Sequence, residues 1–173
     1  DDDNELNLKP RGQPLVPFLE KIGFLSERFL AVHCVKLTQD EAEVFRRYDV
    51  KINYNPMANA YLGSGIPPMA LLKKRGLTLS MGTDGAASNN TSDMLETLKA
   101  GLLLQKAQAK RANVLSAQDM LDFATCSGAA AVHQQAFTGS IEAGKSADLF
   151  LFDPDFLRST PVVDPVATLM YSS

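Results

Sequence analysis

The chain has 173 residues, which is enough for one ordinary domain with a sizeable core. With 45% hydrophobic and 21% charged residues, the composition is globular and excludes a disordered or membrane-embedded chain. A net charge of -3 argues against nucleic acid or an anionic membrane as the main partner. Cys34 and Cys126 lack the spacing of a disulfide framework, so we expect a cytoplasmic protein.

The first third of the chain alternates helix and strand signals. Residues 14–23 predict a helix that ends at a glycine, and the apolar run 29–35 predicts a strand. Thr38 and Glu41 then have the spacing of a capping box, in which each side chain bonds the other residue's backbone N–H. An amphipathic helix is therefore expected to begin there.

The same alternation continues through the middle of the chain. Residues 50–54 and 77–81 read as strands, and the proline-started segment 69–74 between them reads as a helix. Helices over about 92–110 and 116–127 follow. Strands and helices in this order indicate right-handed βαβ units, so we predict the α/β class with a parallel sheet.

The C-terminal part changes character. Residues 139–148 form a glycine-containing turn segment, and the aromatic run 149–153 after it reads as a strand. Prolines are frequent beyond that point. We therefore predict two units: residues 1–137 in an α/β domain, and residues 138–173 at the start of a small β domain.

Two residues of ligand type follow predicted strands. His33 ends the apolar run 29–33, and Asp84 follows strand 77–81 after Gly82. In barrels and open α/β sheets, catalytic groups lie at the carboxyl ends of strands. Asp84 could instead simply hydrogen-bond its own loop, and His33 could be a core histidine bonded to a backbone carbonyl. Their occurrence in successive βα units favours a shared site.

Four ordered motifs resemble the amidohydrolase superfamily, in the branch that contains methylthioadenosine/S-adenosylhomocysteine deaminases and triazine hydrolases. They are HCVKL at 33–37, NPMAN at 55–59 with LGSG at 62–65, GTDGAASNN at 82–90, and GSIEAGKSAD at 139–148. The resemblance implies a metal-dependent (β/α)8 barrel flanked by a small β-sandwich. The three strands here would be barrel strands six to eight, and residues 149–153 would be one strand of the sandwich.

The resemblance also implies roles for individual residues. Asp84 would bind one divalent metal, zinc or alternatively iron, and would take a proton from the attacking water. His33 would orient that water. The family's HxH pair and HxxE motif do not occur in these 173 residues. We therefore expect the chain to be part of a longer protein, and we expect that it cannot assemble the metal site alone.

Substrate contacts are expected near these residues. Tyr54 stands where family members often have histidine, and it is a candidate together with Asn55 and Ser88. Ser88 is also placed to cap a following helix. Asn55 and Asn59 are expected mainly to hold their loop through Asx-type bonds to the backbone.

The combined prediction is a metal-dependent hydrolytic deaminase of an amino-substituted N-heteroaromatic ring, of adenosine, guanine or triazine type. Hydrolytic dechlorination of an s-triazine is one alternative, and a non-catalytic binding relative is another. A phosphate cradle at residues 62–65 is disfavoured because the segment lacks the known phosphate-binding fingerprints. The expected partner is a small heteroaromatic molecule, with neither nucleic acid nor membrane involved, and a homo-oligomer is compatible with the sequence.

Overall fold

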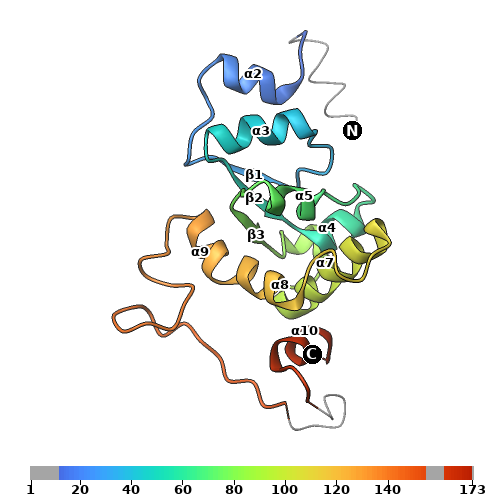
Figure 1. Cartoon of the computed structure of the whole chain (residues 1–173), viewed down its shortest axis with the longest axis vertical. Helices are drawn as coiled ribbons and strands as arrows, with labels where there is room; N and C mark the ends of the chain where they lie inside the picture. The colour runs from blue at the N-terminus through green and yellow to red at the C-terminus, as the bar shows by residue number, and fades with distance from the viewer. Residues whose placement is uncertain (1–11, 155–161, 173) are drawn as a thin grey trace.

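The structure is a computed structural model that describes residues 12–154 and 162–172 (Figure 1). The two predicted domain ranges also include residues 1–11, 155–161 and 173, which lie outside the described residues. The division into two domains therefore stays a prediction.

A three-stranded parallel sheet forms the centre of the described structure. Its strands are β1 (Leu30–Val32), β2 (Lys51–Tyr54) and β3 (Leu79–Met81), in the order β1-β2-β3. This confirms the predicted class and the parallel pairing. The predicted strand 29–35 is too long, because His33 and Cys34 adopt φ angles of 69° and 51° and turn the chain out of the ladder.

Helices occupy the segments between and after the strands, as predicted. They are α2 (Leu15–Lys21), α3 (Gln39–Arg47), α5 (Met69–Lys74), α7 (Met94–Ala109) and α8 (Ala117–Ala124). The predicted capping box is present at the start of α3: Thr38 accepts from the Glu41 backbone N–H, and Glu41 accepts from that of Thr38. A second capping box, Ser116 with Asp119, starts α8. Local side-chain chemistry thus sets where these helices begin.

Four further helices were not predicted. They are α4 (Pro56–Tyr61), α6 (Ala86–Asn89), α9 (Cys126–Ala131) and α10 (Pro165–Ser172). Two of them, α4 and α6, directly follow β2 and the β3 loop, so they lie at the carboxyl edge of the sheet. None of the helices in the described ranges is long and apolar enough to cross a membrane.

The hydrophobic core lies on one face of the sheet. Ala31, Ile52 and Leu79 are neighbours across the three strands, and all three are buried. The helices supply apolar side chains to the same cluster, among them Phe45, Leu72, Leu98, Leu102 and Met120. This face therefore fixes the sheet against its helices.

On the opposite face of the sheet, β2 and β3 carry polar side chains. Side chains alternate along a strand, so Asn53 and Ser80 point away from the core cluster. The Ser80 hydroxyl donates to Asn53 Oδ1 (2.9 Å), and Asn53 Nδ2 donates to Asn55 Oδ1 (2.6 Å). We call Ser80, Asn53 and Asn55 the polar ladder. It leads along the sheet to the carboxyl ends of the strands.

The ladder needs a glycine beside it. A Cβ added to Gly82 would lie 2.7 Å from Asn55 Oδ1 and 3.0 Å from Asn53 Nδ2. Any other residue at position 82 would therefore displace the ladder. Close approach of the ladder to the backbone therefore explains the glycine at the start of the GTDG motif.

The C-terminal region departs from the prediction. Residues 149–153 have no strand assignment, because no strand within residues 12–154 and 162–172 pairs with them. Residues 138–154 instead extend away from the sheet, and the chain returns as helix α10, which packs against α7 and α8 (Figure 1). An extended segment needs a hydrogen-bonded neighbour to become a strand, and sequence alone does not supply one.

Candidate functional site

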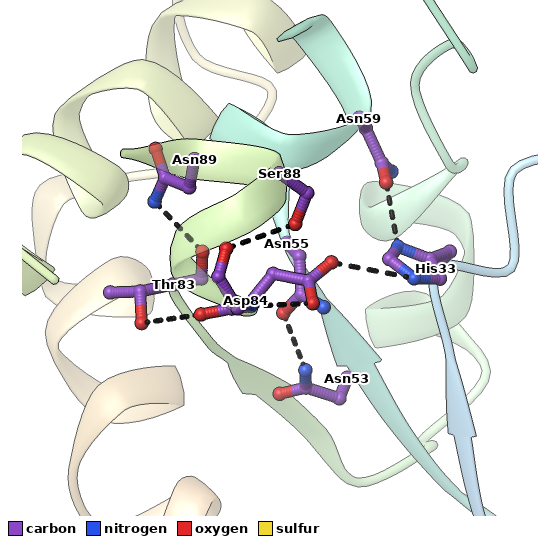
Figure 2. A network of polar contacts seen from close by, with 9 residues as sticks. His33, Asn53, Asn55, Asn59, Thr83, Asp84, Ser88 and Asn89 are labelled. Carbon is purple, nitrogen blue, oxygen red and sulfur yellow. Dashed lines mark hydrogen bonds and ion pairs between the residues drawn. The ribbon is translucent and has the colours of Figure 1, made fainter. Parts of the chain in front are cut away.

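His33 and Asp84 lie together at the carboxyl edge of the sheet. His33 follows β1, Asp84 follows β3, and His33 Nε2 is 3.6 Å from Asp84 Oδ2 (Figure 2). Their side chains are 42% and 29% exposed, so both can reach a bound molecule. The structure thus brings together the two residues that the strand-end pattern singled out.

Both residues adopt a left-handed backbone conformation. The φ angle is 69° at His33 and 64° at Asp84, a region that residues other than glycine occupy infrequently. Histidine and aspartate tolerate it better than most residues do. His33 comes directly after β1 and Asp84 comes three residues after β3, and each turn directs the side chain along the edge of the sheet. The conformation therefore accounts for how the two groups meet.

The loop that carries Asp84 is held by hydrogen bonds of its own. Asp84 Oδ1 accepts from the Gly85 N–H (2.7 Å), so Oδ2 is the oxygen that faces His33. The Ser88 hydroxyl donates to the Gly85 carbonyl (3.1 Å), and Asn89 Nδ2 donates to the Thr83 carbonyl (2.8 Å). Helix α6 thus fixes the loop on both sides of Asp84 (Figure 2).

His33 is held from the other direction by α4. Its Nδ1 is 2.7 Å from Asn59 Oδ1, and Asn59 is almost completely buried. The prediction that Asn59 holds its loop through backbone bonds is therefore wrong. Sequence reasoning did not find this contact; the available signal was the position of Asn59 one helical turn after the end of β2.

The candidate substrate-contact residues differ in position. Ser88 is half-buried and close to Asp84 (Figure 2), with its hydroxyl engaged in the loop. Asn55 lies beside Asp84 but is only 3% exposed, and its Oδ1 accepts from Asn53. Asn55 makes no side-chain cap bond to α4, so the expected Asx-type bond is absent. Ser88 is the better placed of the two for contact with a ligand.

Tyr54 lies on the opposite face of the sheet from the polar ladder. It is fully buried, and burial raises the pKa of its hydroxyl to about 12. The Tyr54 hydroxyl lies close to Gln105, whose amide donates to the Pro67 carbonyl (2.8 Å), and no described residue makes a hydrogen bond of good geometry with the hydroxyl. This placement argues against the predicted substrate contact.

A Tyr54→Phe substitution in the full-length protein tests that prediction. We expect an unchanged KM, and a free energy of unfolding that is unchanged or higher by up to ~1 kcal/mol, because an unpaired buried hydroxyl is removed. Urea denaturation and steady-state kinetics measure the two quantities. Tyr171→Phe is the matched control, since the Tyr171 hydroxyl accepts from Lys106 (2.5 Å) and its loss should destabilise. A several-fold rise in KM for Tyr54→Phe would instead support the predicted contact between Tyr54 and the substrate.

Other potential ligands can be set aside. Burial raises the pKa of the Cys34 thiol to about 12, with a smaller contribution from Glu41, so without a metal the thiol is protonated at neutral pH. His133 is exposed and its Nε2 bonds the Glu27 carbonyl (3.0 Å), as expected for a surface histidine. The described ranges contain no cluster of three or more His, Cys, Asp or Glu that could hold a metal.

Asp84 nevertheless fits part of a metal site. Asp84 offers a carboxylate oxygen of the kind that zinc binds, and this oxygen faces away from the backbone bond to Gly85. An open pocket of about 570 Å³ borders His33 and Asn59 and runs along β1 between α2 and α3. Asp84 does not line this pocket. We therefore place the candidate site at the strand ends and not in the pocket.

Comparisons with known proteins identify the family of this chain. The model of the amidohydrolase family matches residues 13–172. A 5'-deoxyadenosine deaminase from Methanothermobacter thermautotrophicus is 38% identical over 173 residues, 99% of this chain and 40% of that protein. An S-triazine hydrolase from Gordonia rubripertincta is 33% identical over 156 residues, 90% of this chain and 33% of that protein.

A solved structure shows the same arrangement. The crystal structure of an adenosine deaminase from Xanthomonas campestris with bound zinc superposes with a TM-score of 0.95 at 33% identity, covering 99% of this chain and 39% of that one. The chain thus spans between a third and two fifths of the length of these proteins. Its sequence motifs, its fold and the family match agree, and the chain belongs to the amidohydrolase family.

Proposed function

We propose that the whole protein is a metal-dependent hydrolase that removes an exocyclic amino group from an adenosine-like heteroaromatic ring. The observation that carries the proposal is the His33–Asp84 pair, 3.6 Å apart at the carboxyl ends of two parallel strands. A family relative of this chain is a 5'-deoxyadenosine deaminase, which supports the choice of ring.

The proposal includes the remainder of the fold. The three strands would be the sixth to eighth of a (β/α)8 barrel, with further metal ligands supplied by other strands of the whole protein. Residues 138–153 would join a β-sandwich that provides the partner strands. Both cysteines of the chain are free, in keeping with the proposed cytoplasmic location.

The side chains of this pair have the properties that the reaction needs. A bound divalent metal would lower the pKa of a water molecule to about 7. Asp84 would be one of its ligands, and its carboxylate would accept a proton from the attacking water and pass it to the leaving nitrogen. Water attacks the ring carbon, the C–N bond breaks, and ammonia leaves as the ring gains an oxo group. His33, across from Asp84, would orient the water, and Ser88 would contact the substrate.

Product analysis on the full-length, zinc-loaded protein tests the proposal. We expect ammonia release from 5'-deoxyadenosine, faster than from guanine or from an amino-substituted s-triazine. Chloride release from a chlorinated s-triazine is the competing outcome, which the similarity to an S-triazine hydrolase makes worth measuring. A full-length protein that takes up no zinc and binds these rings without turnover would instead support a non-catalytic relative.

A further inference from the structure

We propose that Asn59 is a positioning residue that holds the His33 ring with a proton on Nδ1. This inference deepens the proposed function and rests on it for its catalytic consequence. Asn59 Oδ1 lies 2.7 Å from His33 Nδ1. A carboxamide oxygen only accepts hydrogen bonds, so the ring nitrogen that faces it must be the donor. The other nitrogen, Nε2, then carries the lone pair and faces Asp84.

The distance on the other side of the ring agrees with this assignment. Nε2 is 3.6 Å from Asp84 Oδ2, which is longer than an N–H···O hydrogen bond of about 2.7–3.2 Å. With the proton on Nδ1, Asp84 is not engaged by His33. Its Oδ2 remains available to accept a proton from water.

The backbone of Asn59 is held by two hydrogen bonds, and its side-chain Oδ1 faces His33, while its buried Nδ2 has no hydrogen-bond partner among the described residues. Its backbone N–H donates to the Asn55 carbonyl (3.0 Å), and its own carbonyl accepts from the Ser64 N–H (2.9 Å). The side chain is only 2% exposed, inside a helix whose Pro56 and Ala58 are also buried. His33, by contrast, is 42% exposed on a left-handed turn and would otherwise be free to rotate. A buried, fixed acceptor therefore orients a mobile ring.

Nitrogen NMR of the full-length, zinc-loaded protein with ¹⁵N-labelled histidine, recorded at alkaline pH, tests the proposal. His33 signals are assigned by their absence in His33→Gln. We expect the wild-type ring to be protonated on Nδ1. In Asn59→Leu we expect this signature to be lost or mixed, and kcat to fall by about 10–100-fold with little change in KM. Asn59→Asp, whose carboxylate still accepts, should restore the Nδ1–H signature.

The matched control is Gln105→Met, which removes another buried carboxamide, bonded to the Pro67 carbonyl and remote from His33. It should lower stability but leave the His33 tautomer and kcat unchanged. A wild-type ring protonated on Nε2, as the opposite orientation of the Asn59 amide would require, overturns the proposal. An unchanged His33 tautomer in Asn59→Leu would also overturn the proposal.

The NMR readout separates this inference from the proposed function. If no substrate is turned over but the tautomer depends on Asn59, the function fails and the positioning role stands. If ammonia is released while the tautomer is independent of Asn59, only the positioning role fails. Should Asn59→Leu not fold, the wild-type spectrum alone still decides which nitrogen carries the proton.

Discussion

Replacing Asp84 by Asn is expected to leave the full-length protein folded and to remove nearly all turnover. The amide is close in size to the carboxylate, and asparagine tolerates the left-handed backbone found at position 84. An amide nitrogen, however, cannot accept a proton from water. Loss of a general base typically lowers the rate by ~10²–10⁴-fold, and weaker metal binding would add to this. Steady-state kinetics, metal analysis and thermal unfolding measure the three effects.

The control for this substitution is Asp122→Asn. Asp122 lies on α8, where its carboxylate accepts from Gln118 (2.7 Å), and an amide oxygen can still accept there. The turnover of Asp122→Asn should match that of the parent protein. If Asp84→Asn retained activity within a few-fold of the parent, Asp84 would be a loop-holding residue, and its bond to the Gly85 N–H would be its whole role.

His33→Ala is expected to lower kcat by at least ~10²-fold while the metal content per chain stays near that of the parent. The reason is that His33 is proposed to orient the attacking water and not to bind the metal. His133→Ala is the natural control, because these are the two histidines of the chain and His133 lies at the surface. Its kcat should not change.

A structural role for His33 would give a different pattern. Thermal stability would fall, while activity per folded molecule would be preserved. Measuring the fraction of folded protein alongside kcat distinguishes the two. Loss of bound metal in His33→Ala would be a third pattern, and it would make His33 a ligand instead of an orienting group.

Features that depend on neighbours in sequence could be predicted. The capping boxes at Thr38 and Ser116 are formed by residues three positions apart, so their spacing alone locates the starts of α3 and α8. The three strands follow from apolar runs between helices. The meeting of His33 and Asp84 follows from the rule that parallel strands end at one edge.

Features that depend on residues distant in sequence could not be predicted in this way. The contact between His33 and Asn59 joins residues 26 positions apart, across two separate elements. Side chains alternate along β2, so Tyr54 points to the face that carries the hydrophobic core. The motif comparison alone had placed Tyr54 near the site. A strand at 149–153 requires a partner, and helix α10 requires the surface of α7 and α8. Tertiary packing decides each of these.

Helix α10 has a consequence for the segment that precedes it. Its Tyr171 takes a hydrogen bond from Lys106 of α7, whose ammonium also lies 5.2 Å from the centre of the Tyr171 ring. The chain leaves the helices after α9, and the contact between Tyr171 and Lys106 attaches α10 to α7. Loss of this contact would weaken the attachment of α10 to α7 and would leave the hydrogen bonds of the sheet in place.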